Sequence, residues 1–392
     1  MKIQTQKKIS SKKGVLVAPV FMENLKNLST AFPEKVKEFI LNLVKEKEFK
    51  AKKGEVIYTY LQAENLPHKL LIVGLGSSEK YNGNISRRIG AKISKIAKQH
   101  KNNEITLILI DEMIASVKEL LEGFHFAQYK FDFFKTSKKE NGLHKSIDIL
   151  ELITDKKFDF EGSSKKAQML AEGMNFTKDL INSPSNYVDA KHLTREARKI
   201  AKDNRYEIEV FGKKELEKMG WGGLLAVNQG AVKEAQCVIL KYFGADDKKE
   251  KPIVIVGKGV IFDTGGYNLK PTNNIETMHQ DMAGAATVLG IFKILKGLRI
   301  KKNIIGITPM AENLVSAEAY RPSDIIKMYS GKTVEITNTD AEGRLILADA
   351  ITHATKLNPE AIITIATLTG AVAVALGDRY AGVMGNNSKL RR

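Results

Sequence analysis

The sequence contains a single cysteine, Cys237, among its 392 residues. A disulfide bond within the chain is therefore excluded, and this scarcity favours a reducing compartment, so we expect a cytoplasmic location. Because Cys237 begins the apolar stretch CVILKYF, we expect a small buried core residue there.

The sequence also lacks an apolar run long enough to cross a membrane, which takes about 20 residues. The longest apolar stretch, residues 361–377, is interrupted by threonines and glycines, and we interpret it as a buried strand, a turn and the start of a helix. The apolar run at 15–21 is too short for a secretion signal and contains Pro19, so it is better interpreted as a strand. No membrane partner is expected.

Several common catalytic motifs are missing. No H-E-x-x-H or G-x-S-x-G occurs, which disfavours a zinc site of the common helical type and a serine nucleophile on a strand-to-helix turn. The GLG at 74–76 lacks the rest of a dinucleotide-binding G-x-G-x-x-G, and we interpret it as a tight turn.

Acidic residues are too few to balance the basic ones, since 45 Asp and Glu face 62 Lys and Arg, for a net charge of +17. Such an excess raises nucleic acid as a partner. However, the basic residues are mostly lysines mixed with glutamates, as in VKEKEFKAKK at 44–53, without interleaved aromatic residues. A solvated lysine-rich surface is the favoured interpretation, and a basic nucleic-acid-binding protein is kept as an alternative.

What the sequence does contain is a repeated alternation of strand and helix patterns. Two apolar runs, 69–76 and 104–111, flank a segment in which Ile89, Ile93 and Ile96 recur at helical spacing. Strand, helix and strand in this order imply a right-handed crossover and a parallel sheet.

The later part of the chain shows the same alternation, with predicted strands at 252–257, 303–308, 333–337 and 361–366. Pro184 ends a preceding helical pattern, and Asp189 is a suitable N-cap for the next helix. The sequence thus predicts an α/β protein with mainly parallel sheets. We place an N-terminal α/β domain at 1–150, a linker helix region at 151–190 and a second α/β domain at 191–392.

Two short segments, VGKGVIFDTGGYNLKPTNNIETMHQDMAGA at 256–285 and NTDAEGRL at 338–345, concentrate charge within apolar, glycine-rich sequence. Buried charges persist only when they are paired or bound to metal. The charged residues concerned are Lys258, Asp263, Lys270, Asp281, Asp340, Glu342 and Arg344.

These segments are expected to meet at one edge of the sheet. Lys258 follows the predicted strand at 252–257, and Asp340 comes shortly after 333–337. Ligands of open α/β sheets bind at the carboxyl ends of the strands. The strand at 361–366 delivers Thr367, Leu368 and Gly370 to the same edge.

Local geometry suggests how the charges face one another. If DAEGR at 340–344 is extended, alternate residues point the same way, so Asp340, Glu342 and Arg344 would face one cavity. Asp281 is expected to open a helix, whose positive end suits a carboxylate.

Four carboxylates, from Asp263, Asp281, Asp340 and Glu342, would neutralise two divalent cations, a common hydrolytic arrangement. One lysine could serve as a nitrogen ligand while another stays charged and polarises a carbonyl. A nitrogen ligand favours zinc, manganese or cobalt over magnesium or calcium. A two-metal phosphoesterase is chemically open as well, although no motif favours it.

These residues resemble the leucyl aminopeptidase family, the cytosol aminopeptidases of peptidase family M17, of which NTDAEGRL is the most specific signature. LLIVGLG, EGFHFAQYKFDFFK and NSPSNYV extend the resemblance through the chain. It implies a macro-like N-terminal α/β domain, a catalytic C-terminal domain and a homo-oligomer, a hexamer in the family. It also implies an aminopeptidase acting on peptides, with a leucine-like preference.

The resemblance implies a role for each matching residue. The tightly bound metal, manganese or zinc, would be held by Lys258, Asp263, Asp281 and Glu342. The exchangeable metal would be held by Asp263, Asp340 and Glu342. A metal-bridged hydroxide would be the nucleophile, with Lys270 polarising the scissile carbonyl and Arg344 holding a bicarbonate as general base.

The resemblance also implies a substrate pocket. Met278, Thr367 and Gly370 would line the pocket for the first side chain, and Leu368 would offer backbone contacts. Tyr267 and Asn268 depart from the family pattern and are expected to alter the pocket.

The sequence ends at GVMGNNSKLRR, whereas relatives continue further. The resemblance therefore predicts that the catalytic sheet, the substrate pocket and the assembly surface are incomplete at the C-terminus. A catalytically inactive fragment is the alternative that follows.

Overall fold

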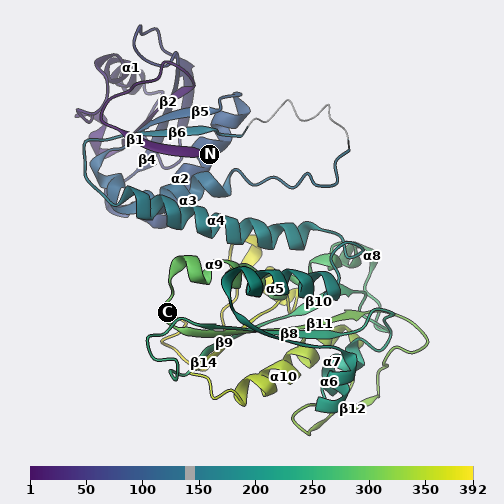
Figure 1. The fold of residues 1–392 in the computed structure, drawn as a ribbon. Coiled ribbons are helices and arrows are strands. Elements are labelled where there is room, and N and C mark those ends of the chain that lie inside the picture. Colours follow the sequence, from purple (N-terminus) through teal and green to yellow (C-terminus); the bar gives the residue numbers. More distant parts are fainter. Residues whose placement is uncertain (137–145, 392) are drawn as a thin grey trace. The chain divides into compact units, whose positions relative to one another are not determined.

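The computed structural model describes residues 1–136 and 146–391, and the chain divides into two compact units (Figure 1). Unit 1 is Met1–Asn175 and unit 2 is Phe176–Arg392. The division falls within helix α4, Phe160–Asn182, inside the region 151–190 that sequence analysis assigned to the connection. Each unit is described by itself below.

Unit 1 contains a six-stranded sheet in the order β1-β6-β5-β2-β4-β3. Its strands are parallel except for the edge strand β3, which pairs antiparallel with β4. The strand predicted at 15–21 and the parallel sheet predicted from the apolar runs at 69–76 and 104–111 are confirmed. The bounds are β1 Lys2–Gln6, β2 Val15–Phe21, β3 Val56–Tyr60, β4 Lys69–Gly76, β5 Glu104–Ile108 and β6 Ile149–Ile153.

The described helices that lie wholly within unit 1 are α1 Glu34–Lys45, α2 Gly83–Gln99 and α3 Val117–Phe126. Ile89 and Ile93 of α2 are buried, as their spacing predicts. Helices α2 and α3 approach so closely that a Cβ added at Gly123 would lie 2.0 Å from the Arg87 carbonyl oxygen. Glycine is therefore required at this crossing.

Unit 2 contains a second sheet in the order β14-β9-β11-β8-β7, with β10 pairing beside β9 along β11. Strands β14, β9, β10 and β11 are parallel, and β8 and β7 continue the sheet antiparallel. The α/β class with mostly parallel sheets is thus confirmed. The bounds are β7 Glu207–Phe211, β8 Gln236–Phe243, β9 Ile253–Gly257, β10 Gly259–Asp263, β11 Asn303–Asn313 and β14 Ala361–Ile365.

Helices cover both faces of this sheet (Figure 1). One core joins α5 and α9 to one face, and a second core joins α6, α7 and α10 to the other. Asp189 caps α5 by accepting a hydrogen bond from the His192 amide at 2.8 Å, as predicted. The bounds are α5 Ala190–Asn204, α6 Lys213–Met219, α7 Gly222–Val227, α8 Thr272–Ile275, α9 Ala283–Leu298, α10 Glu342–Thr355 and α11 Ala371–Leu376.

The structure corrects the prediction that residues 333–337 form a strand of the main sheet. Among the strands that the structure describes, β13, Thr333–Glu335, pairs only with β12, Ile325–Lys327, in a separate antiparallel hairpin. The chain turns at Gly331, whose φ is +83°, so that β13 runs back along β12 instead of along a strand of the larger sheet.

The prediction that DAEGR is extended is also wrong. A 3-10 helix covers Thr339–Ala341, and α10 begins at Glu342. The Asn338 side chain accepts a hydrogen bond from the Asp340 amide at 2.8 Å, which starts the helical turn instead of an extended strand.

The stretch 361–377 forms the predicted strand, turn and helix, β14 and α11, but the expectation of burial is wrong. Strand β14 is at the sheet edge and pairs only with β9 among the described strands. Its residues are half-buried or exposed, and Val374 of α11 is 90% exposed. Cys237, in contrast, is buried in β8 as predicted.

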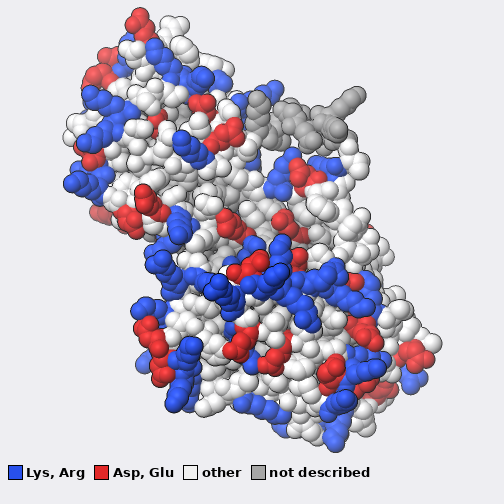
Figure 2. All heavy atoms as spheres, in the orientation of Figure 1, with Lys and Arg blue, Asp and Glu red and all other residues white. Residues whose placement is uncertain are grey.

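The surface charge is mixed in sign. On the face drawn in Figure 2, Lys and Arg are interspersed with Asp and Glu. Exposed lysines lie beside carboxylates, such as Lys301 at 3.2 Å from Asp246. Among the described residues, no helix is both long and apolar enough to cross a membrane.

Candidate active site

Six of the charged residues singled out from sequence come together at the carboxyl ends of β9 and β10 in unit 2. Lys258 lies between these two strands, and Asp263 ends β10. Asp281 precedes α9, and Glu342 begins α10. Lys270 and Asp340 complete the group through the salt bridges described below.

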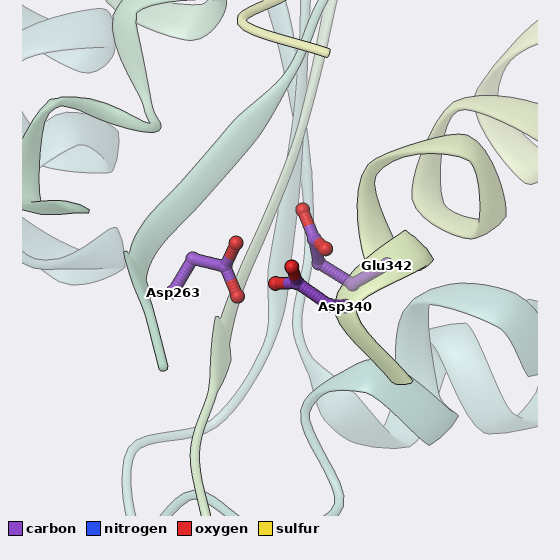
Figure 3. A group of neighbouring side chains, drawn as sticks. All are labelled: Asp263, Asp340 and Glu342. Atoms are coloured by element: carbon purple, nitrogen blue, oxygen red, sulfur yellow. The ribbon is translucent and has the colours of Figure 1, made fainter. Parts of the chain in front are cut away.

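Figure 3 shows three of the carboxylates, Asp263, Asp340 and Glu342, pointing toward one another. One oxygen from each of these side chains lies within 4.8 Å of the other two. Asp263 and Glu342 are both 2% exposed, so their charges are removed from water. Three carboxylates at this separation repel one another unless cations lie among them.

Lys258 supplies one of these cations. Its Nζ lies 2.8 Å from Asp281 Oδ2 and 2.8 Å from Glu342 Oε1, and it donates to the Thr367 carbonyl at 3.0 Å. The three charged side chains are at most 5% exposed. Thr367 also donates through its hydroxyl to Asp281 Oδ1 at 2.7 Å, so β14 is connected to the same cluster.

Lys270 supplies the second cation. Its Nζ lies 2.9 Å from Asp263 Oδ2 and 2.5 Å from Asp340 Oδ1. This pair of salt bridges is more accessible, because the Asp340 side chain is 33% exposed. The site therefore contains two lysine ammonium groups, each between two carboxylates.

Burial and charge act in opposite directions on the pKa values of these groups. Burial opposes the charge on Lys258, but Glu342 and Asp281 outweigh that cost and raise the pKa of the amine. Burial raises the pKa of the Asp281 and Glu342 carboxyls, and Lys258 only partly reverses this effect. Partial burial likewise opposes the charge on Lys270, but Asp340 and Asp263 raise the pKa of its amine well above the ordinary value.

Comparison with known proteins shows the family to which the chain belongs. The catalytic domain of the cytosol aminopeptidase family matches residues 175–392, and its N-terminal domain matches residues 17–138. The chain belongs to the cytosol aminopeptidase family. It is thus a peptidase of the M17 group, and the resemblance noted in the sequence is confirmed.

Individual relatives agree with this assignment. A "Probable cytosol aminopeptidase" of Syntrophotalea carbinolica is 38% identical over 357 residues, covering 89% of this chain and 71% of the relative. A protein of the same description from a Sulfurihydrogenibium species is 38% identical over 354 residues, covering 89% and 70%. One from Rickettsia canadensis is 36% identical over 351 residues, covering 88% and 69%.

The extended segment by which sequence analysis expected to place Arg344 beside Asp340 and Glu342 is absent from this aminopeptidase. Because α10 begins at Glu342, residues two apart point to different sides of the helix instead of the same side. Glu342 is buried, whereas Arg344 is exposed and has no ion-pair partner among the residues described.

The predicted pocket residues have different positions. Thr367 contacts Lys258 and Asp281 directly, as described above. Met278 is half-buried in the 3-10 helix Met278–Gln280, just before Asp281. Leu368 is 47% exposed, and Gly370 is exposed at the start of α11.

Three supporting residues were missed by the sequence analysis, Asn313, Tyr320 and Thr339, and Asn268 was named there only for its effect on the pocket. Asn313 Nδ2 donates to Asp263 Oδ1 at 2.8 Å and to the Thr339 carbonyl at 3.1 Å. Asn313 was overlooked because the predicted strand ended at 308, before Pro309, while β11 continues to Asn313. The signal available in the sequence was the position of Asn313 at the end of the mainly apolar run NIIGITPMAEN.

The donor set fits divalent cations. Asp281 Oδ2 and Asp340 Oδ1 are buried and lack a hydrogen bond of normal geometry, although a lysine ammonium lies beside each. Their lone pairs are therefore not fully used. Four carboxylates exceed the charge of the two lysines, and carboxylate oxygens with an amine nitrogen suit zinc or manganese.

Proposed function

We propose that this chain is a two-metal aminopeptidase that removes N-terminal residues from peptides, with a preference for leucine-like side chains. The observation that carries the proposal is the pair of lysine ammonium groups, each set between two carboxylates. Lys258 lies between Asp281 and Glu342, and Lys270 lies between Asp263 and Asp340. Family membership supports peptides as the substrate class.

Two divalent cations, manganese or zinc, are proposed to bind among these side chains. Lys258, Asp263, Asp281 and Glu342 would hold one, and Asp263, Asp340 and Glu342 would hold the other. When bound, the cations would polarise the peptide carbonyl and lower the pKa of a water molecule. Asp263 and Glu342 belong to both proposed sets, which agrees with their burial at 2% exposure.

The two lysines are proposed to act differently. Lys258 is enclosed by protein groups and would have to lose a proton to offer its nitrogen to a metal. Lys270 is less enclosed, and its raised pKa keeps it charged. We therefore assign to Lys270 the hydrogen bond that polarises the scissile carbonyl and stabilises the developing oxyanion.

Arg344 is proposed to hold a bicarbonate that acts as general base. The exposure of Arg344 and the lack of an ion-pair partner among the described residues leave its guanidinium open to an anion. Met278, Thr367 and Gly370 are proposed to line the pocket for the first side chain, with Leu368 offering backbone contacts. The contacts of Thr367 with Lys258 and Asp281 support a pocket beside the cluster. A hexameric assembly and a cytoplasmic location stay predictions.

The direct test is hydrolysis of leucine amide by the purified chain after chelation, with and without added Mn²⁺ or Zn²⁺. We expect turnover only with metal. The variant Lys270→Met should lose about 10²- to 10³-fold in kcat while still binding Mn²⁺. The exposed lysine of α6, in Lys214→Met, is the matched control and should leave both measurements unchanged.

Two outcomes would contradict the proposal in different ways. A folded chain that binds metal but gives no turnover would support the inactive-fragment alternative. Full turnover by Lys270→Met would remove the role assigned to that lysine while leaving the peptidase activity in place.

A further inference from the structure

Thr339, the residue before Asp340, connects two segments that carry the proposed active-site residues. The first is the loop 264–270, which ends with Lys270, and the second is the 3-10 helix Thr339–Ala341. Thr339 is fully buried, at 0% exposure. Both its side chain and its backbone bond to groups from other segments.

The hydroxyl of Thr339 bonds to the loop in both directions. Oγ1 donates to the Gly265 carbonyl at 2.6 Å and accepts from the Asn268 amide at 2.9 Å. The Thr339 amide in turn donates to Asn268 Oδ1 at 2.7 Å. A hydroxyl has one proton, and Thr339 donates it to the Gly265 carbonyl. The Thr339 oxygen can therefore accept the hydrogen bond from the backbone N–H of Asn268.

The carbonyl of Thr339 extends the network to the carboxylates. It accepts from the Tyr320 hydroxyl at 2.6 Å and from Asn313 Nδ2 at 3.1 Å. Asn313 Nδ2 also donates to Asp263 at 2.8 Å. Burial raises the pKa of Tyr320, so the phenol stays protonated and able to donate.

The glycine pair of the loop permits this close approach. Gly265 and Gly266 have φ of +86° and +66°, which L side chains rarely adopt. A Cβ at Gly266 would lie 2.9 Å from Thr339 Oγ1, and one at Gly265 would lie 3.0 Å from Asp340 Oδ1. The loop therefore packs directly on Thr339 and Asp340.

We infer that the Thr339 hydroxyl is a positioning group that sets the separation of Lys270, Asp263 and Asp340. The inference rests on the proposed function. Without the hydroxyl, the Gly265 carbonyl and the Asn268 amide lose their partner, and the loop is no longer held against the 3-10 helix. Lys270 and Asp340, now 2.5 Å apart, would then lose their fixed spacing.

The matched pair of variants is Thr339→Val, which keeps the shape without the hydroxyl, and Thr339→Ser, which keeps the hydroxyl. We measure Mn²⁺ binding by electron paramagnetic resonance and leucine amide hydrolysis by initial rates. Thr339→Val should weaken binding of the second Mn²⁺, the ion proposed to lie among Asp263, Asp340 and Glu342, roughly 10- to 100-fold. It should also lower kcat with little change in KM. Thr339→Ser should restore both.

Asn268→Ala is the second variant, because Asn268 is itself exposed and the loss of its side chain should not unfold the chain. It should weaken the second Mn²⁺ in the same direction, and it decides the matter if Thr339→Val fails to fold by circular dichroism. If the Thr339→Val chain folds and binds Mn²⁺ as tightly as the wild-type chain, the inference is overturned while the proposed function stands. Absence of Mn²⁺ binding by the wild-type chain overturns the proposed function, and the inference with it.

Discussion

Units 1 and 2 share an architecture but differ in where they bury charge. Each has a six-stranded, largely parallel sheet. Unit 1 buries two carboxylates among its described residues, Glu122 and Glu151. Unit 2 buries the charged residues Lys258, Asp263, Asp281, Glu312, Glu342 and Asp349.

The partners of the buried charges differ as well. In unit 1, Glu122 pairs with the partly exposed Arg87 at 2.6 Å, and Glu151 accepts hydrogen bonds from the Ser10 and Thr106 hydroxyls. In unit 2, Lys258 and its two carboxylates are closed off from water at the ends of strands. A similar scaffold thus becomes a candidate active site when charges gather at the carboxyl ends of the strands.

Removal of the Lys258 ammonium should have the largest effect. Lys258→Met leaves Asp281 and Glu342 buried without a cation, so we expect a loss of about 3–5 kcal/mol in the free energy of unfolding of the metal-free protein. Urea titration followed by the fluorescence of Trp221, the single tryptophan, reports on unit 2 alone.

The matched control in unit 1 is Arg87→Met, followed by circular dichroism. We expect a smaller loss, about 1–2 kcal/mol, because Arg87 is 33% exposed and Lys118 lies 3.9 Å from Glu122. Equal losses in the two variants would mean that the strand-end cluster is not specially enclosed.

The next effect concerns Asp349, a buried carboxylate of unit 2 that acts through backbone amides. It accepts from the Leu224 amide at 3.0 Å and from the Tyr329 amide at 2.9 Å. Asp349→Ala leaves these donors unpaired and should cost about 2 kcal/mol. Asp349→Asn keeps one acceptor oxygen and should cost less, and a reversed order in urea titrations would refute this role.

The smallest effect is expected from His353, which packs 5.6 Å from Trp221 between ring centroids. Burial holds the pKa of His353 below the ordinary value of 6.5. The unfolded chain therefore binds the extra proton first, so stability falls as the pH drops below about 6.5. His353→Phe should flatten this acid limb in Trp221 fluorescence.

His125 of unit 1 provides the comparison, since burial also lowers its pKa. His125→Phe should leave the Trp221 signal unchanged, because the two residues belong to different units. If His125→Phe flattens the acid limb as much as His353→Phe, the two units do not respond separately to acid.

Local patterns predicted much of the fold. The apolar runs at β2 and β4 and the N-cap at Asp189 are short-range features, and the structure has them where the sequence placed them. The grouping of Lys258, Asp263 and Glu342 also followed from sequence, because buried charge at strand ends has few physical explanations.

The errors arose where backbone geometry depends on distant partners. Asn338 turns the chain into a helix ahead of Glu342, so the alternation expected for an extended segment from Asp340 to Arg344 is absent. Thr339 and Asn268 are ordinary polar residues in the sequence, and only their 2.7 Å contact across 71 positions identifies them as a pair.

The single cysteine makes opening of the unit 2 sheet measurable. Cys237 lies on β8 with no exposed surface, and burial raises the pKa of its thiol, so the reactive thiolate is scarce while the sheet is closed. A thiol reagent can reach the sulfur only after the strands separate. The rate of its modification therefore counts opening events of the sheet beneath the candidate active site, without any introduced probe.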